Sequence, residues 1–157
     1  MFPTKILLAT NGSKESALAE AAAVELSEGT GSELHVVCVV KTVPEMPYPR
    51  MAFRERTEYL LDARKLNGLR VLDGRVKQIK ELGGEVAASH YREGEPLKEI
   101  LRLAEELDAG LIVTGGQKRP WLERAFGAGL SELLYRRSKS PVLVVNEQTS
   151  RRSTVSR

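Results

Sequence analysis

Short apolar runs alternate with longer amphipathic stretches along most of the chain. The runs are bounded by glycine, proline or polar turn residues, which is typical of strands. They cover residues 5–10, 34–40, 86–92, 111–114 and 141–145. Most are continuously apolar, as in a parallel sheet that is covered on both faces. The run at 86–92 is more polar and predicts an edge strand.

The stretches between these runs predict helices. Ser13 is a candidate N-cap for a helix over 13–27, and Pro96 suits the first position of a helix that follows the third run. A charged stretch from about 52 to 82 predicts a long helix, in which Gly68 and Gly74 are weak points. A short helix is expected over 130–137. The apolar face of the first helix is predicted at Ala17, Leu18, Ala21, Ala22 and Val24. That of the long helix is predicted at Leu66, Leu69, Leu72, Val76 and Ile79.

The resulting order, in which strands and helices alternate, predicts an α/β fold of three layers, with a five-stranded parallel sheet between helices. One domain is expected over residues 1–146. Residues 147–157 are expected to form a basic, disordered tail. Ligands of such sheets bind beyond the carboxyl ends of the strands, where the strand order reverses.

The charge balance changes this picture little. The chain has 24 Lys and Arg against 21 Asp and Glu, and a net charge of +3. Three of the arginines lie in residues 151–157, and without them the basic and acidic residues are equal in number. The sequence therefore indicates a basic tail rather than a basic face, and no nucleic acid partner is expected.

A single cysteine and two histidines argue against a disulfide framework and against a Cys- or His-based metal site. Cys38 lies in the most apolar run and is interpreted as a small buried residue. His35 and His90 are interpreted as structural. The first apolar run is too short for a signal peptide and no run is long enough to span a membrane, so a cytoplasmic protein without a membrane partner is expected.

Small and polar residues follow the first and fourth predicted strands. Thr10, Asn11 and Gly12 come after the first, and Thr114, Gly115 and Gly116 after the fourth. Gly127, Ala128 and Gly129 precede the last helix, whose N-terminus would offer free backbone N–H groups. Small residues and a helix N-terminus together suit a phosphate, although a glycine after a strand is often only a turn.

The chain resembles the universal stress protein family over about residues 3–146. The similarity lies in Lys5–Ser13, in Gly94-Glu95-Pro96 with the stretch Ala104–Gly115, and in Ser140–Val145. Several motifs in the right order make it more specific than any one of them. The resemblance implies strand order 3-2-1-4-5 and homodimers that pair through the last strand, here Val142–Val145.

The resemblance also implies an ATP site, since many members bind ATP at a loop of the pattern G-x-x-G-x9-G-[ST] after the fourth strand, although the family also contains members that lack this loop. An Asp after the first strand and an apolar residue of the second strand contact the adenosine part in many members. Transferred to this chain, the implied contacts are Ala9, Thr10, Asn11, Val39, Thr114, Gly115, Lys118, Ala128, Gly129 and Leu130. Magnesium is expected only together with a nucleotide.

This sequence departs from the pattern at four of these positions. Asn11 replaces the Asp, Lys118 the second Gly, and Ala128-Gly129 the final Gly-[ST] pair. Asn11 keeps a carbonyl acceptor and adds two donors, and Lys118 could fill the groove or supply a cation to phosphates.

Three functions therefore stay open. The first is a dimeric, non-enzymatic regulatory or protective stress-response protein that binds ATP, ADP or AMP. The second is a dimeric interaction or scaffold member that binds no nucleotide. The third is a slow ATPase, which is disfavoured because no P-loop Lys-[Ser/Thr] pair and no acidic pair for magnesium are recognisable.

Overall fold

The computed structural model describes residues 1–41, 51–116 and 129–146, and only the backbone for residues 51–59. Its strands are β1 (Lys5–Ala9), β2 (Glu33–Val40), β3 (Ala88–Glu93), β4 (Leu111–Gly115) and β5 (Val142–Val145). Its helices are α1 (Lys14–Thr30), α2 (Met51–Glu81), α3 (Pro96–Leu107) and α5 (Leu130–Arg137). The expected tail, 147–157, lies outside the described residues.

The five strands form one parallel sheet in the order β3-β2-β1-β4-β5, as expected. The polar strand β3 lies at one edge and β5 at the other. Strand β1 is central, where Leu7 pairs with His35 of β2 on one side and with Ile112 of β4 on the other. The strand order reverses between β1 and β4, so the carboxyl ends of these two strands mark the switch point of the fold.

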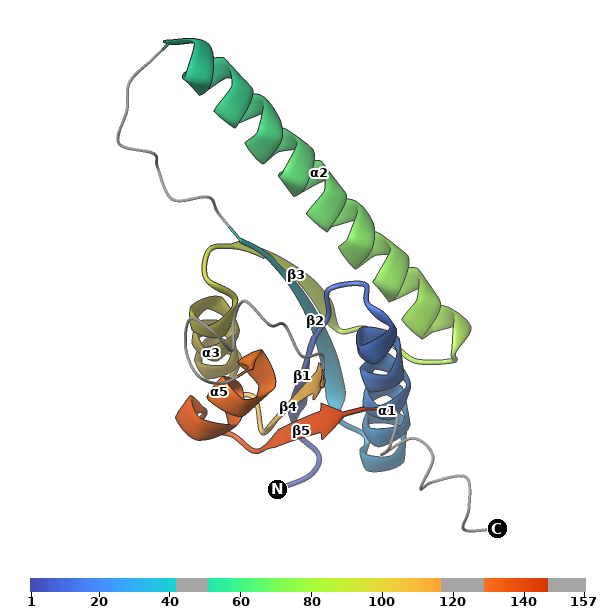
Figure 1. The fold of residues 1–157 in the computed structure, drawn as a ribbon. Helices are drawn as coiled ribbons and strands as arrows, with labels where there is room; N and C mark the ends of the chain where they lie inside the picture. The colour runs from blue at the N-terminus through green and yellow to red at the C-terminus, as the bar shows by residue number, and fades with distance from the viewer. Residues whose placement is uncertain (42–50, 117–128, 147–157) are drawn as a thin grey trace.

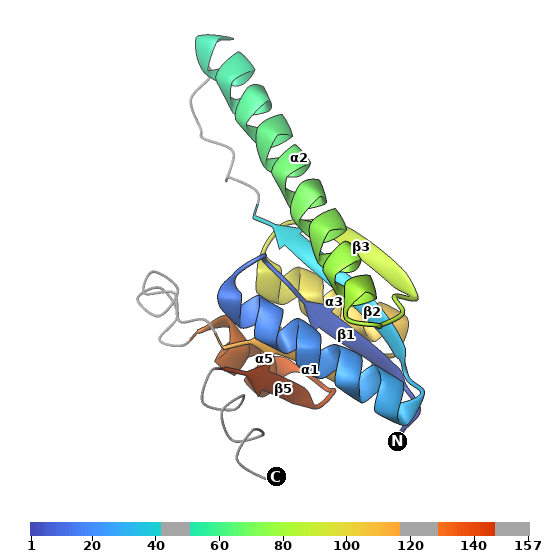
Figure 2. The same ribbon diagram turned by 90° about the vertical axis from the view of Figure 1, so that its right-hand side faces the viewer.

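Helices α1 and α2 cover one face of the sheet, and α3 and α5 cover the other (Figures 1 and 2). Alternation along β1 explains both layers of the core. Ile6 and Leu8 point towards α1 and α2, while Leu7 and Ala9 point towards α3 and α5. All four are buried.

The predicted apolar face of α1 is wrong at Ala21, whereas Val24 is buried as predicted and Leu18 and Ala22 are partly buried against the core. Ala21 is exposed, and the buried side chains are Ser16, Ala19, Glu20, Ala23, Val24 and Ser27. Three of these are polar, and each has a hydrogen-bond partner that offsets the cost of burial. The helix also runs three residues further than predicted and ends before Gly31, which caps it with φ 67°.

Helix α2 runs unbroken through Gly68 and Gly74 and is longer than the sheet it covers. Its 31 residues span about 46 Å, whereas the eight residues of β2 span about 26 Å. Its N-terminal half projects past the sheet (Figures 1 and 2). Leu72 and Ile79 are buried as predicted, but Leu66 and Leu69 are 56% and 39% exposed. The predicted stripe is therefore wrong at those two leucines, because the buried face of this part of the helix runs through Gly68, Leu72 and Ile79 and leaves them to one side.

Strand β3 begins two residues later than predicted, since Val86 and Ala87 lead into it. Ala87 N nevertheless donates to Leu34 O over 2.8 Å, so the chain already runs beside β2 there. The prediction and the structure therefore differ only in where β3 begins and ends, and the topology of the sheet is unchanged.

Candidate functional site

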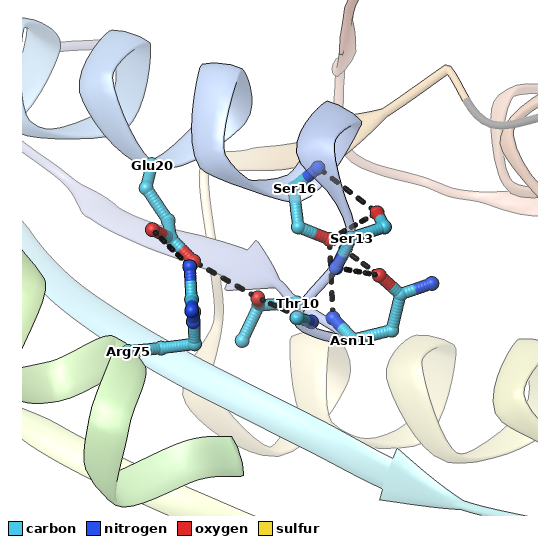
Figure 3. Close-up of polar contacts among 7 residues, drawn as sticks. Thr10, Asn11, Ser13, Ser16, Glu20 and Arg75 are labelled. Carbon is cyan, nitrogen blue, oxygen red and sulfur yellow. Dashed lines mark hydrogen bonds and ion pairs between the residues drawn. The ribbon is translucent and has the colours of Figure 1, made fainter.

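The turn between β1 and α1 is held by a closed set of hydrogen bonds around Asn11 (Figure 3). Asn11 Oδ1 accepts from Ser13 N over 3.0 Å and from Ser16 Oγ over 2.7 Å. Asn11 N donates to Ser16 Oγ, and Ser13 Oγ caps the helix by accepting from Ser16 N. Both acceptor positions of the Asn11 carbonyl are thus used inside the turn.

Glycine is needed in this turn at position 12. Gly12 has φ 78°, a left-handed conformation that other residues adopt at a cost. A Cβ placed there would also lie 3.2 Å from Cγ1 of Val71 on α2. The turn is therefore in contact with α2 as well as with α1.

A buried carboxylate lies behind the turn. Glu20 is fully buried, and its Oε1 accepts from the Thr10 hydroxyl over 3.1 Å. Its Oε2 lies 3.7 Å from Nη1 of Arg75 on α2 (Figure 3). Desolvation raises the pKa of the Glu20 carboxyl, and the hydrogen bond from Thr10 and the charge of Arg75 partly offset this.

Gly115, at the carboxyl end of β4, is required by close packing. A Cβ there would lie 2.6 Å from the carbonyl carbon of Glu15 in the first turn of α1. The end of β4 and the start of α1 therefore approach each other more closely than a side chain would allow. Thr114, one residue earlier, is buried.

A cavity of about 360 Å³ opens at the carboxyl ends of β1, β2 and β4, at the switch point of the sheet. This size falls in the range of small-molecule sites. The sheet contributes mainly apolar side chains, and α3 and α5 add more from the opposite wall. Polar groups come from the β1–α1 turn and from residues that follow β2 and β3. The lining residues are Ala9, Thr10, Asn11, Ser13, Ser16, Val37, Val39, Lys41, Glu95, Pro96, Leu97, Ile100, Thr114, Gly115, Leu130 and Leu133.

Seven of the ten residues singled out by sequence line this cavity together. They are Ala9, Thr10, Asn11, Val39, Thr114, Gly115 and Leu130. Gly129 is the N-cap of α5 with φ −72° and ψ 165°, and it has no side chain to cap the helix. Lys118 and Ala128 lie outside the described residues.

Sequence reasoning missed the wall opposite the β1–α1 turn. Pro96, Leu97 and Ile100 reach the cavity from α3, which the sequence marks only as a helix with an apolar face. Lys41 and Glu95 directly follow the predicted second strand and the Gly94 turn. Their position beyond the carboxyl ends of parallel strands was the signal that could have identified them.

The remaining reactive side chains lie elsewhere. Cys38 is buried, and burial raises the pKa of its thiol, which disfavours a nucleophilic role. His35 and His90 pack against each other near the start of β2 and β3, away from the cavity. Over residues 1–41, 51–116 and 129–146, no cluster of three or more His, Cys, Asp or Glu is arranged to hold a metal. Within the same ranges, no helix is long and apolar enough to cross a membrane.

Comparison with known proteins assigns the family. The sequence profile of the universal stress protein family matches residues 3–146. The chain belongs to the universal stress protein family. The universal stress protein YxiE of Bacillus subtilis is 30% identical over 145 residues, covering 90% of this chain and 97% of that protein. Universal stress protein MJ0531 of Methanocaldococcus jannaschii is 29% identical over 143 residues, covering 91% of this chain and 82% of that protein.

Solved universal stress proteins share the fold. UspA from Lactobacillus plantarum superposes with a TM-score of 0.75 at 19% identity, over 93% of this chain and 99% of that chain. A universal stress protein in complex with cAMP gives 0.68 at 23% identity, over 91% and 97%. One from Archaeoglobus fulgidus in complex with dAMP gives 0.62 at 21% identity, over 93% and 100%. At these identities the similarity establishes the Rossmann-like fold.

Proposed function

We propose that this universal stress protein binds an adenine nucleotide in the cavity at the carboxyl ends of β1 and β4, and acts as a dimeric regulatory or protective stress-response module. The observation that carries the proposal is the cavity itself, because an apolar sheet surface and a polar turn meet in it at the switch point of the fold. Family members of the same fold in complex with cAMP and dAMP support the same ligand class.

The lining residues divide into parts that suit a nucleotide. Ala9 and Val39 offer apolar surface to a base, and Asn11 lies on the polar side of the lining, next to the nucleoside. The N-terminus of α5, at Gly129 and Leu130, has backbone N–H groups that suit a phosphate. Lys41 adds a cation to the lining. Lys118 and Ala128, outside the described residues, are proposed to belong to the phosphate side, with magnesium present only as a nucleotide complex.

Two measurements test the ligand. Protein purified without added nucleotide is denatured, and any released small molecule is identified by chromatography and mass spectrometry. Calorimetric titration with ATP, ADP, AMP and cAMP follows. Saturable binding of one of them is expected, and the absence of binding up to millimolar concentrations would refute the proposal.

A variant locates the site. Ala9→Leu adds side-chain volume to the lining and is expected to block the nucleotide, because Ala9 borders the empty space. Ala21→Leu places the same change on the exposed face of α1 and serves as the matched control. Equal nucleotide affinity in the two variants would place the ligand elsewhere.

Turnover is not part of the proposal. A slow ATPase predicts phosphate release that scales with protein concentration and disappears in Ala9→Leu. We expect no such release.

The scaffold function remains the second candidate, and one observation favours it. The Asn11 carbonyl is already bonded to Ser13 N and Ser16 Oγ, and the N-cap of α5 lacks a side-chain hydroxyl. Both features reduce the acceptors and donors that a nucleotide would meet. A dimer that contains no nucleotide and binds none would support this alternative.

The proposed dimer pairs through β5. This strand lies at the edge of the sheet, and Val142, Leu143 and Val144 are only partly buried in the single chain. A second copy would satisfy its outer backbone groups. Sedimentation velocity over a range of concentrations is expected to show a dimer, and a monomer at every concentration would contradict it.

A further inference from the structure

Two consecutive turns of α1 hold two consecutive residues of the β1–α1 turn. Ser16 bonds both the backbone N–H and the Oδ1 of Asn11. Glu20, four residues later on the same buried face, accepts from the Thr10 hydroxyl. Figure 3 shows the two sets of contacts side by side. Glu20 thereby fixes the residue that directly precedes Asn11.

The Glu20 carboxylate is incomplete without α2. Its Oε2 is buried and has no hydrogen-bond partner among the described residues. Its countercharge is the Arg75 guanidinium, 3.7 Å away and one quarter exposed. A buried carboxylate that loses its cation must change its protonation or its position. The contact between Thr10 and Glu20 therefore depends on where α2 places Arg75.

A second, independent contact joins the same elements. Val71, one turn before Arg75 on α2, packs against Gly12 in the turn. The turn thus touches α2 directly at Gly12 and indirectly through Thr10 and Glu20. Asn11 lies between these two points and lines the cavity.

We propose that Glu20 is a positioning residue that relays the position of α2 to the turn carrying Asn11, so that nucleotide affinity depends on how α2 packs. This inference rests on the proposed function, because it concerns regulation of the same site. It assigns to the long helix a role in ligand binding, although none of the α2 side chains that the structure describes lines the cavity.

The test compares Arg75→Met in the wild-type and Glu20→Gln backgrounds. The amide introduced by Glu20→Gln keeps an oxygen for the Thr10 hydroxyl but carries no charge for Arg75 to pair with. In the wild-type background, Arg75→Met is expected to shift the NMR amide resonances of residues 11–13 and to weaken ATP binding by about three- to tenfold. In the Glu20→Gln background the same change is expected to alter ATP affinity by less than about twofold.

Two further variants control for general effects. Lys77→Met removes a charge from the same helix, where Lys77 pairs with exposed Asp73 over 3.8 Å, and should leave both readouts unchanged. Arg75→Lys keeps the charge and should restore most of the affinity. If Arg75→Met does not fold, Arg75→Gln replaces it with the same expectation, since the side chain at 75 is partly exposed.

The outcomes are decisive in each direction. Equal effects of Arg75→Met in both backgrounds, or unchanged amide resonances in the folded wild-type background, would overturn the relay. If none of ATP, ADP, AMP and cAMP binds to any of the proteins, the proposed function fails, while the amide resonances of residues 11–13 in the free protein still decide whether Glu20 transmits the change.

Discussion

The imidazole rings of His35 and His90 stack with centroids 5.4 Å apart, and Nδ1 of His35 lies 3.1 Å from Nε2 of His90. His35 Nε2 lies 3.4 Å from Oε2 of Glu33, which assigns a donor to that nitrogen. His35 Nδ1 is then the acceptor and His90 Nε2–H the donor when both rings are neutral. Protonation of both rings would place two N–H groups against each other.

Stability is therefore expected to fall in mild acid because of His90. Desolvation, followed by the charges of His35 and Arg92, lowers its pKa below the ordinary 6.5, while Glu106 acts in the opposite direction. At this position the unfolded chain binds the proton more tightly than the folded chain. The contribution of neutral His90 to the free energy of unfolding is therefore present above pH 6.5, and it is lost as the pH falls through the lowered pKa.

Urea unfolding of wild type and His90→Gln, from about pH 8 to about pH 5, checks this prediction in the range where histidine titrates. The free energy of unfolding of wild type should decrease relative to the variant as pH falls. A constant difference between the two proteins would contradict it.

Replacement of Gly68 by alanine is expected to destabilise the protein, whereas replacement of Gly74 by alanine is expected to stabilise it. A Cβ at position 68 would collide with Cγ2 of Val40 and lie 3.0 Å from Cε2 of Tyr91. Gly68→Ala should therefore lower the free energy of unfolding by about 1–3 kcal/mol. A Cβ at position 74 meets nothing within 4 Å, so Gly74→Ala should stabilise by about 0.4–1 kcal/mol. Chemical denaturation measures the free energy of unfolding of both variants. Equal changes in the two would show that α2 does not approach the sheet at residue 68.

Glu20→Gln is expected to be at least as stable as wild type at neutral pH. Burial raises the pKa of Glu20 above its ordinary 4.5, so the folded state binds the proton more tightly than the unfolded state. Wild-type stability should then decline, relative to the variant, as pH rises from 4.5 through the raised pKa. Unfolding free energies of both proteins across this range provide the measurement, and a rise of wild type relative to the variant would be inconsistent with the buried contact.

Ser16→Ala is expected to loosen the β1–α1 turn. The Ser16 hydroxyl both accepts from Asn11 N and donates to Asn11 Oδ1, so its removal should cost about 1 kcal/mol of stability and weaken nucleotide binding. Ser89→Ala, on the exposed side of β3, is the matched control. Thermal melts and ATP titrations compare the stability and the ATP affinity of the two variants. The absence of any difference would mean that the turn keeps its conformation without the Ser16 hydroxyl.

Local pattern predicted the alternating elements and the parallel sheet because each element carries its own signal, while the strand order was implied by the family resemblance. The apolar runs and the turn residues between them depend on neighbouring positions, and the alternation then fixes a parallel sheet. The buried face of α1 could not be predicted in this way. Ser16 and Glu20 are buried because Asn11, Thr10 and Arg75 satisfy them, and Arg75 is distant in sequence.

The lining residues of the candidate site that lie at the ends of strands were predicted, and those that lie on helix α3 were missed. Thr10, Asn11, Thr114 and Gly115 were found because the carboxyl ends of parallel strands converge. Ile100 and its neighbours on α3 reach the cavity only through the packing of that helix against the sheet. Likewise, the exposure of Leu66 depends on which face of α2 packs on the sheet, and Gly68 and Leu72 lie on that face instead.

The projecting half of α2 also has a mechanical consequence. A rigid helix that is anchored at one end behaves as a lever, and a tilt of about 10° would move the far end of a 15-residue arm by about 4 Å. Conversely, a small force at the tip produces a large torque at the anchored end, where Val71 lies against Gly12 and Arg75 pairs with Glu20 of α1. In the proposed relay, the length of α2 therefore increases the torque that a weak force at its tip exerts beside the Asn11 turn.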